Sequence, residues 1–460
     1  MTDLARLRPT VAELREMARL ATPIVLVNVG LQGMGFVDVL MLGRVSAAAL
    51  AAAALGNFYF FITSIVGIGL LMVLDPIVAQ AVGARDEPGI ARGLQRGLLL
   101  SFGVSVVIGL SFVPAGAVLG LLGQPADVTP LAAGYVIWSI PGLLPFFAFN
   151  ALRQVLQALT RVRPIVIAVI AGNVANAGLN WVLIYGHLGF EPGGVVGSSQ
   201  GTAIARWLML AVLLVSCWPV IRPRLVPWRA ESLQLAPLWR MFVIGAPIAM
   251  QMFAEAAAFG IVTVMTGWMG TTTLAGHEIT LSLAALTFMV PMGVAAAAAV
   301  MVGHAVGAGD VAESRRDAVA ALAVGVGFMA AMAVVFWVIP GALAGAFTTD
   351  PATRIMATTL IPIAAVFQVF DGTQVISASI LRGAGDTRVP MVLHILSFWA
   401  VGIPLGALVA FKFDGGAPGL WWGLTAGLAA AAVLQLARVR SQLGGEIERV
   451  RVDQPARSAP

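Results

Sequence analysis

The chain has 460 residues, of which 59% are hydrophobic and only 11% are charged, and its mean hydropathy is +0.93. A soluble domain has about 25% charged residues, so this composition excludes a soluble protein and indicates a polytopic membrane protein. A single cysteine, Cys217, excludes internal disulfides and cysteine metal clusters. The formal net charge of +5 does not indicate a nucleic-acid partner, because the arginines follow the expected membrane topology.

Twelve apolar segments are long enough to cross a membrane, since a helix needs about 20 residues to span a hydrocarbon core of about 30 Å. In chain order they cover residues 18–41, 52–80, 97–122, 131–152, 164–186, 201–220, 240–266, 276–305, 318–347, 356–381, 389–411 and 418–437. Pro114 and Pro340 interrupt the third and the ninth. The polar stretch before the first segment holds no cleavage-site pattern, so that segment is expected to be an uncleaved insertion signal.

The basic residues predict the orientation of the chain. When the 27 Lys and Arg residues are assigned to alternating sides of the twelve segments, all but four fall on the side that carries both termini. The four exceptions are Arg44, Arg354 and Lys412 on the other side and Arg206 near the end of a segment. Because basic residues concentrate in cytoplasmic loops, both termini are expected in the cytoplasm.

The two halves of the chain repeat each other. At a shift of 224, the run "VAQAVGARD" from Val78 lies over "VGHAVGAGD" from Val302, and a shift of 226 aligns Pro164 with Pro390. Six segments per half, each half starting on the same side, predict parallel repeats related about the membrane normal. We therefore expect an N-terminal lobe at 1–221, a cytoplasmic linker at 222–239, a C-terminal lobe at 240–437 and a cytoplasmic tail at 438–460. Two lobes facing each other would leave a central cleft.

Three acids lie inside apolar segments. Glu255 and Asp371 are in the middle of segments of the second half, and Asp38 is near the end of the first segment. An acid at the centre of a membrane helix costs about 3 kcal/mol, so such residues usually face a cavity or a partner and mark an ion or substrate pathway. The alternative is a purely structural role, with neighbouring hydroxyls satisfying the carboxyls.

Nearby amides extend this candidate site. A carboxylate in a medium of low dielectric can carry a proton, or it can ligate a bare cation with help from carbonyls and amides. For Glu255 and Asp371 the candidate amides are Gln251, Gln368 and Gln374. Either event neutralises the site, and a cationic drug would neutralise it too, so that ion and drug compete and antiport follows.

A second group of amides lies near Asp38 in the sequence-predicted fold. Asn173, Asn176 and Asn180 are spaced by 3 and 4 residues, which places them on one face of a helix. They are candidates to line a cavity in the first lobe. Interhelical hydrogen bonding is the equally weighted alternative.

Three motifs then resemble the multidrug and toxic compound extrusion (MATE) family. They are "FVDVLMLGRVSAAALAAAALGN", "TFMVPMGVAAAAAVMVGHAVGAGD" and "FQVFDGTQVISASILRGAGDTRVPM". The acid pair Glu255 and Asp371 is similar to that of the bacterial NorM-type branch. The resemblance implies an all-α integral membrane protein of twelve transmembrane helices, in two six-helix lobes that form a V-shaped central cleft.

The resemblance also implies a function. The family exports cationic, amphipathic compounds in exchange for Na⁺ or H⁺, so the expected partners are such drugs, the coupling ion and membrane lipid, with no cofactor. The expected location is the bacterial inner membrane, and the expected state is a monomer. The implied cation-coupling residues are Glu255, Asp371, Asp38 and Glu278, with Glu255 and Asp371 as the site for Na⁺ where that is the ion.

Other residues carry weaker signals. Phe288 and Met292 suit a promiscuous apolar cavity, and they fit an ordinary core or lipid-facing position equally well. The four histidines have no metal-ligand spacing. Asp75, Asp86 and Asp310 are expected to anchor loops.

Two alternatives to an antiporter stay open. A lipid-linked precursor flippase of the same superfamily should show more basic residues inside its spans, where only Arg206 qualifies. A passive channel would not accumulate a drug against its gradient. No nucleotide-binding loop, nucleophile-base pair or metal box is present in the sequence, so we do not expect an enzyme.

Overall fold

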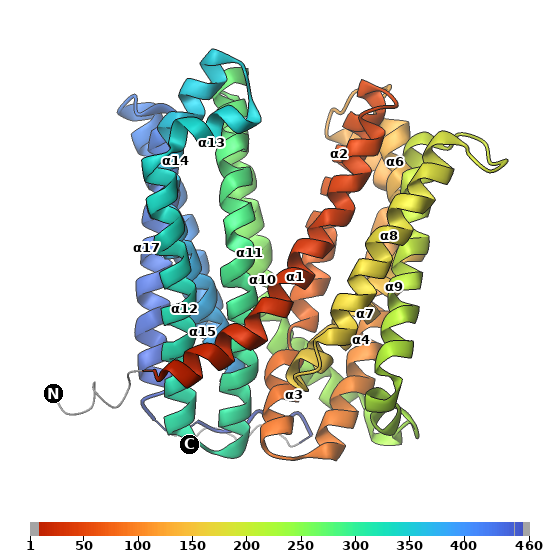
Figure 1. The fold of residues 1–460 in the computed structure, drawn as a ribbon, viewed down its shortest axis with the longest axis vertical. Coiled ribbons are helices and arrows are strands. Elements are labelled where there is room, and N and C mark those ends of the chain that lie inside the picture. The colour runs from red at the N-terminus through yellow and green to blue at the C-terminus, as the bar shows by residue number, and fades with distance from the viewer. Residues whose placement is uncertain (1–8, 446, 454–460) are drawn as a thin grey trace. The chain divides into compact units, whose positions relative to one another are not determined.

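The computed structural model describes residues 9–445 and 447–453, and this part of the chain is helical throughout its regular structure (Figure 1). Residues 1–8 of the predicted first lobe and 454–460 of the predicted tail lie outside the described residues. The α-helices are α1 (Val11–Leu42), α2 (Ala47–Leu71), α3 (Leu74–Gly83), α4 (Glu87–Phe112), α5 (Ala115–Leu121), α6 (Thr129–Ser139), α7 (Leu143–Ala158), α8 (Arg163–Tyr185), α9 (Gly194–Leu225), α10 (Leu235–Gly267), α11 (Thr271–Ala308), α12 (Val311–Val338), α13 (Pro340–Phe347), α14 (Pro351–Gly383), α15 (Arg388–Ile395), α16 (Ile403–Ala407) and α17 (Gly416–Gln442).

Shorter helical turns complete the chain. The 3₁₀ turn η2 (Ile140–Gly142) joins α6 to α7, and η3 (Ala230–Leu233) lies between α9 and α10. The π-helical turns η4 (Leu396–Gly402) and η5 (Leu408–Lys412) join with α15 and α16 into one span. Within the described residues twelve spans are long and apolar enough to cross a membrane, which confirms the predicted number and the all-α class.

The helix bounds follow the repeat seen in the sequence. The helices α10, α11 and α12 begin at the repeat equivalents of the first residues of α1, α2 and α4. One difference has a simple cause: α2 and α3 are separate, whereas α11 is continuous. Pro76 lies in the first turn of α3, and the equivalent position of α11 is Val300, which has the backbone N–H that proline lacks.

Two predicted segment ends are wrong. The third segment was expected to run to residue 122, but α4 ends at Phe112 and Pro114 caps the separate helix α5. The ninth was expected to run to residue 347, but α12 ends at Val338 and Pro340 begins α13. In both places proline stops the helix that precedes it and suits the first positions of a new one.

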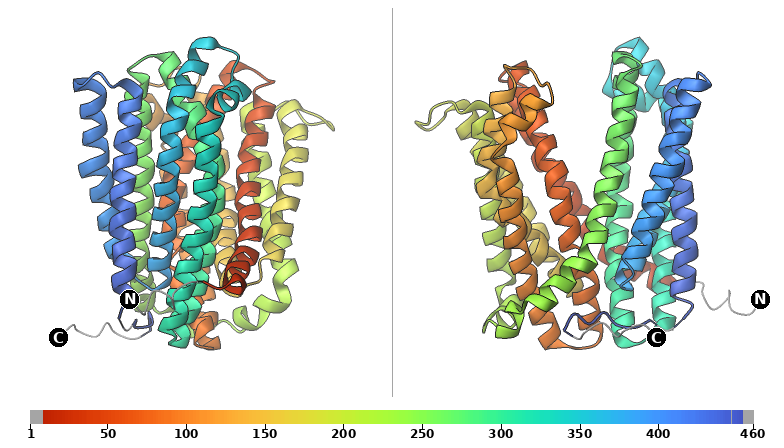
Figure 2. Two further views of the ribbon diagram at one scale, coloured as in Figure 1. Left: turned by 60° about the vertical axis from the view of Figure 1, so that its left-hand side comes forward. Right: turned by 180° about the vertical axis from the view of Figure 1, so that it is seen from behind.

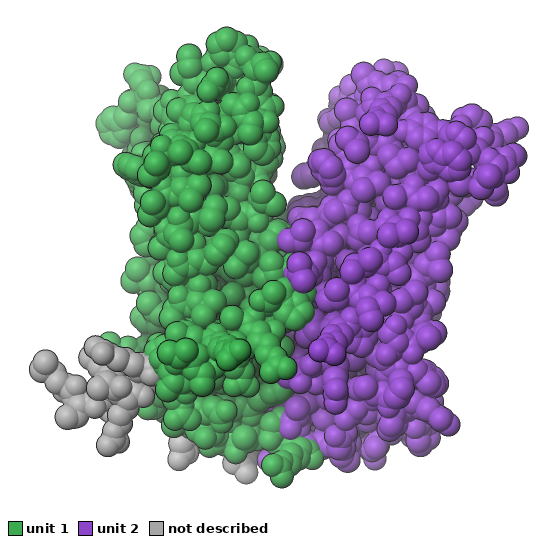
Figure 3. Space-filling view, in the orientation of Figure 1, with its two compact units in different colours: residues 1–25, 83–85, 250–450 green, residues 26–82, 86–249, 451–460 purple. Residues whose placement is uncertain are grey.

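The helices form two compact units, shown in green and purple in Figure 3. Unit 1 holds residues 1–25, 83–85 and 250–450, and unit 2 holds residues 26–82, 86–249 and 451–460. Both α1 and α10 divide between the units, after Val25 and after Ala249, which are equivalent positions of the repeat. The predicted lobe boundaries at 221 and 240 follow the chain rather than the packing, and they stay a prediction, as does the V-shaped cleft.

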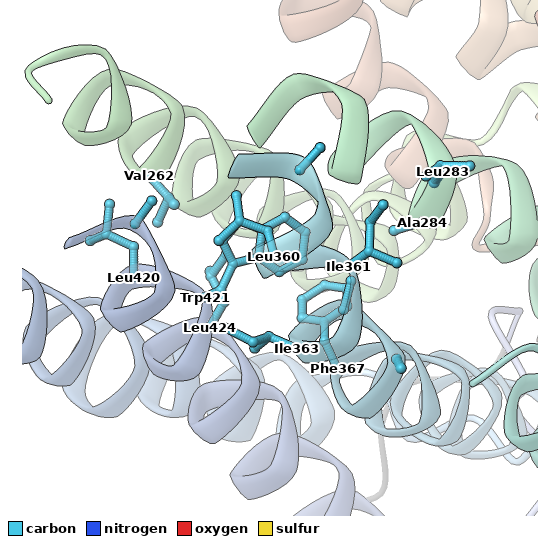
Figure 4. Close-up of a cluster of buried hydrophobic side chains, with 14 of the residues drawn as sticks. Val262, Leu283, Ala284, Leu360, Ile361, Ile363, Phe367, Leu420, Trp421 and Leu424 are labelled. Carbon is cyan, nitrogen blue, oxygen red and sulfur yellow. The ribbon is translucent and has the colours of Figure 1, made fainter. Parts of the chain in front are cut away.

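The core of unit 1 is packed around aromatic rings from α14 and α17, and Figure 4 shows its centre. Trp421 and Phe367 are 0% and 1% exposed, and their ring centroids are 5.4 Å apart in an edge-to-face arrangement. Close helix contact at glycines completes this unit, because Gly402 and Gly406 face Gly427 and Gly423 of α17 without intervening side chains.

In unit 2 the helices α8 and α9 run side by side in every view (Figure 2). Small residues at the start of α9 allow the two helices to approach closely, because a Cβ at Gly201 would lie 2.7 Å from the Asn180 side-chain oxygen. The predicted segment began only at residue 201, because the run from Gly197 to Gln200 is too polar to be read as apolar. Its helix begins at Gly194.

Two of the predicted loop anchors are helix N-caps. The side chain of Asp86 accepts a hydrogen bond from the Gly89 amide at the start of α4, and that of Asp310 accepts one from the Glu313 amide at the start of α12. Each carboxylate thereby satisfies one of the free amides of a first helical turn. The prediction for this pair is confirmed.

Candidate functional site

Asp38 lies at the centre of a buried polar network in unit 2. Its side chain is 2% exposed. Asn180 of α8 donates to one carboxyl oxygen at 2.5 Å, and Thr202 of α9 donates to the other at 3.0 Å. Three helices therefore meet at this carboxyl, and two neutral donors compensate its burial.

The three asparagines of α8 divide between two roles. Asn176 donates to the Thr202 hydroxyl at 2.9 Å and lies beside Asn180, so both belong to the Asp38 network. Asn173 instead donates to the backbone carbonyl of Gly30 in α1 at 2.9 Å. All three asparagines therefore make the interhelical hydrogen bonds of the alternative interpretation, and their cavity-lining role stays a prediction. The Asn180 side-chain oxygen is buried with no hydrogen-bond partner, which leaves one acceptor open beside Asp38.

Arg206 brings a half-buried positive charge to the same unit. Its guanidinium carbon lies 4.2 Å from the ring centroid of Phe60 and 4.9 Å from that of Phe146, a cation–π arrangement. Its charge interacts with that of Asp38. The sequence placed Arg206 near the end of a segment, but α9 begins at Gly194, so the residue lies well inside the helix and that placement was wrong.

Glu255 and Asp371 lie near each other in unit 1. Asp371 of α14 is 7% exposed, the Glu255 side chain of α10 is 25% exposed, and their charges are close enough to interact. Within the part of the chain that the structure describes, no group donates a hydrogen bond to the carboxyl of Asp371 or to that of Glu255. The Asp38 carboxyl, in contrast, has two donors.

The predicted amides surround Asp371 along α14. Gln368, Asp371 and Gln374 are spaced by three residues and so share one helix face. Gln368 accepts a hydrogen bond from the Thr287 hydroxyl of α11 at 3.0 Å, and its amide nitrogen is buried without a partner. Gln251 precedes Glu255 by one turn of α10 and is half-buried.

His394 is the site residue that the sequence did not reveal. Its ring is 0% exposed, and its Nε2 lies 3.6 Å from a carboxyl oxygen of Glu255. Gln374 donates to its Nδ1 at 3.1 Å. The spacing of the four histidines gave no indication of this contact, and no group of three or more metal-ligating side chains is found in the described residues. The one available signal was a histidine inside the apolar run "MVLHILSFW".

The remaining predicted residues are less well connected. Phe288 and Met292 are half-buried along α11, and their cavity-lining role stays a prediction. Glu278 is exposed, and no hydrogen bond or ion pair joins it to another residue of the described ranges, whereas the adjacent His277 is buried. His277 accepts from the Trp421 indole at Nδ1, so its Nε2 carries the proton and donates to Thr263.

This chain matches known proteins along most of its length. The MatE family model matches residues 23–182 and 247–408, two segments whose first residues are equivalent positions of the repeat. The chain is 35% identical over 438 residues to the probable multidrug resistance protein NorM of Mesorhizobium japonicum, covering 93% of each chain. It is 33% identical over 442 residues to the multidrug resistance protein PmpM of Pseudomonas aeruginosa, covering 93% of this chain and 91% of that protein.

Solved structures show the same fold. The structure of the eukaryotic MATE transporter AtDTX14 superimposes with a TM-score of 0.85 at 21% identity, covering 94% of this chain and 98% of that one. A multidrug resistance MATE transporter in an outward-facing conformation superimposes with a TM-score of 0.86 at 18% identity, covering 95% and 97%.

Proposed function

The chain belongs to the MATE family, in its NorM-type branch, and on this premise we propose that it exports cationic, amphipathic compounds in exchange for Na⁺ or H⁺ by alternating access. The names of the relatives, multidrug resistance proteins, support the substrate class. The coupling ion is our inference from the acids.

The proposal depends mainly on the surroundings of the Asp371 carboxyl. It is buried at 7% exposure, its charge interacts with that of Glu255, and no described residue donates a hydrogen bond to it. Two neighbouring carboxylates in an apolar medium repel each other, so binding a cation or a proton relieves that repulsion. A cationic drug would relieve it in the same way, and the competition between drug and ion couples their opposite movements.

Asp38 is proposed as a separate site in the other unit. Its two donors compensate the carboxylate, and the charge of Arg206 acts on it as well. Because neighbouring groups already stabilise the Asp38 carboxylate, a bound cation stabilises it less than it stabilises the Glu255 and Asp371 pair. We therefore assign the main coupling role to Glu255 and Asp371.

The proposed setting is the bacterial inner membrane, with both termini in the cytoplasm and the protein acting as a monomer. The distribution of the 27 basic residues over the twelve spans supports the orientation of the termini. We propose a transport cycle without an enzymatic step.

The test is uptake of a cationic dye into inverted membrane vesicles, with Na⁺ and pH gradients imposed separately. Accumulation above equilibrium under one gradient is expected, with loss of accumulation in Glu255→Gln and Asp371→Asn. Dye that only equilibrates would indicate a passive channel. Vesicles that move no dye but translocate a lipid-linked precursor would favour the flippase.

A further inference from the structure

The eleventh span, formed by α15, η4, α16 and η5, contacts α10 beside Glu255. Two side chains make the contact: the indole of Trp399, in the π-helical turn η4, donates to the Ala254 carbonyl at 3.2 Å, and His394 Nε2 lies 3.6 Å from the Glu255 carboxyl. The ring of Phe398 packs on that of His394 at 4.7 Å. π-Helical turns inside membrane helices occur frequently at functional sites, and here one adjoins a candidate ion site.

A chain of hydrogen bonds fixes the orientation of the His394 ring. It starts at the Pro390 carbonyl, which can only accept, and to which Gln435 of α17 donates at 3.4 Å. The Gln435 oxygen therefore faces Gln374 and accepts from its amide nitrogen at 3.4 Å. The same nitrogen donates to His394 Nδ1 at 3.1 Å. Each amide is oriented by the one before it, so Nδ1 of His394 acts as an acceptor.

The position of the proton on His394 follows from this chain. A neutral imidazole whose Nδ1 accepts carries its proton on Nε2. That nitrogen is buried with no hydrogen-bond partner among the described residues, and the group that faces it is the Glu255 carboxyl. A second proton on Nδ1 would point at the N–H of Gln374, and two donors cannot bond to each other. This series of hydrogen bonds therefore also keeps the imidazole neutral.

We propose that His394 is a positioning residue for the coupling site, presenting a fixed N–H to the Glu255 carboxylate in its ion-free state. The titratable group that faces it is Glu255 on α10, whose charge interacts with that of Asp371 on α14. The side chains of α14 and α17 that are hydrogen-bonded in this series are the neutral amides Gln374 and Gln435. That donor stabilises the ionised carboxylate more than the neutral one, so its contribution falls when Glu255 takes up a proton or a cation. The inference rests on the proposed coupling role of Glu255.

Two substitutions of His394 test whether its Nε2–H acts as a donor to Glu255. In His394→Gln the amide nitrogen can take the place of Nε2–H, whereas His394→Leu has no donor. The measurement is the pH dependence of dye exchange in proteoliposomes containing the full chain. Without the donor, Glu255 should keep its proton to higher pH, so half-maximal exchange in His394→Leu should move upward by about one pH unit. The His394→Gln profile should stay close to that of the wild type.

A second measurement is made on the wild type and needs one folded variant only to assign the signal of residue 394. The chain has four histidines, so ¹⁵N-histidine labelling of the wild type gives few ring signals, and the signal lost in His394→Gln or His394→Leu identifies residue 394. The expected result is the neutral Nε2–H form on both sides of the pH of half-maximal exchange. An imidazolium, or the Nδ1–H form, would overturn the proposal.

The outcomes separate this inference from the proposed function. Wild-type proteoliposomes without any gradient-driven exchange would overturn both. Wild-type exchange with a pH profile that His394→Leu reproduces would overturn the role of His394 alone. A shift in His394→Leu that His394→Gln shares would also overturn it, because then the donor is not what matters.

Discussion

Gly69 and Gly293, which occupy equivalent positions of the repeat, make equivalent helix crossings. Gly69 of α2 lies against Ala249 of α10, and Gly293 of α11 lies against Val25 of α1. Val25 and Ala249 are themselves repeat equivalents, and they are the last residues before α1 and α10 pass from one compact unit to the other. The repeat visible in the sequence therefore extends to these two helix crossings.

The first prediction concerns these crossings. In Gly69→Ala the new methyl would lie 2.5 Å from the Ala249 Cα, which is backbone and cannot turn aside, so α2 and α10 must separate. A lower thermal unfolding temperature of the purified protein is expected. Gly103→Ala in α4 is the control, because nothing lies within 4 Å of its added methyl and alanine favours the helix. Equal unfolding temperatures for the two variants would contradict the crossing.

The second prediction separates charge from folding at the acid pair. Asp371→Asn removes a buried charge that no described residue hydrogen-bonds, so folding should not suffer while gradient-driven dye accumulation is lost. Glu255→Gln should likewise fold normally and lose gradient-driven dye accumulation. The unfolding temperature and the accumulation are measured on the same preparation.

Glu278→Gln is the informative comparison for this pair. The residue is exposed, and no described residue is hydrogen-bonded or ion-paired to it, so accumulation should fall little. Undiminished accumulation in both Asp371→Asn and Glu255→Gln would remove the basis of the coupling proposal.

Features that depend only on the spacing of residues along the chain could be predicted from the sequence. The twelve spans were predicted from apolar length, and Asp86 and Asp310 were predicted as loop anchors, which the structure shows to be helix N-caps. Residue contacts that depend on which helices become neighbours were not predictable. His394 meets Glu255 across two helices that are distant in sequence, and nothing local distinguishes it from His277.

Arg206 and Pro114 illustrate two further limits. A polar run of small residues reads as a loop by composition, yet it folds as the start of α9 because glycines allow close packing on α8. Arg206 was consequently placed near a membrane surface. Apolar length likewise carried the third predicted segment past Pro114, where the missing N–H ends the helix.

The third prediction tests the Asp38 network. Thr202→Val keeps the shape of the side chain but leaves Asp38 with one donor and removes the acceptor of the Asn176 amide. A loss of roughly 1–3 kcal/mol in unfolding free energy is expected for buried groups left without partners. Thr202→Ser retains the hydroxyl and should lose less. A Val variant as stable as the wild type would show that water replaces the hydroxyl.

The last prediction is a pH dependence outside the spans. Asp350 caps α14: its carboxylate accepts from the Thr353 amide at 2.8 Å, and the side-chain and backbone hydrogen bonds from Thr353 hold its pKa below the ordinary value. A pKa that folding lowers gives stabilisation that is present above the unfolded value of about 3.9 and is lost as the pH falls through the folded value.

The test compares the wild type with Asp350→Asn, because asparagine caps a helix without a titrating group. The difference between their unfolding temperatures should be constant near neutral pH. It should move in favour of the variant as the pH drops below about 4, since only the wild type then loses its charged cap. A difference that does not change with pH would mean that the Asp350 carboxylate contributes nothing to the start of α14.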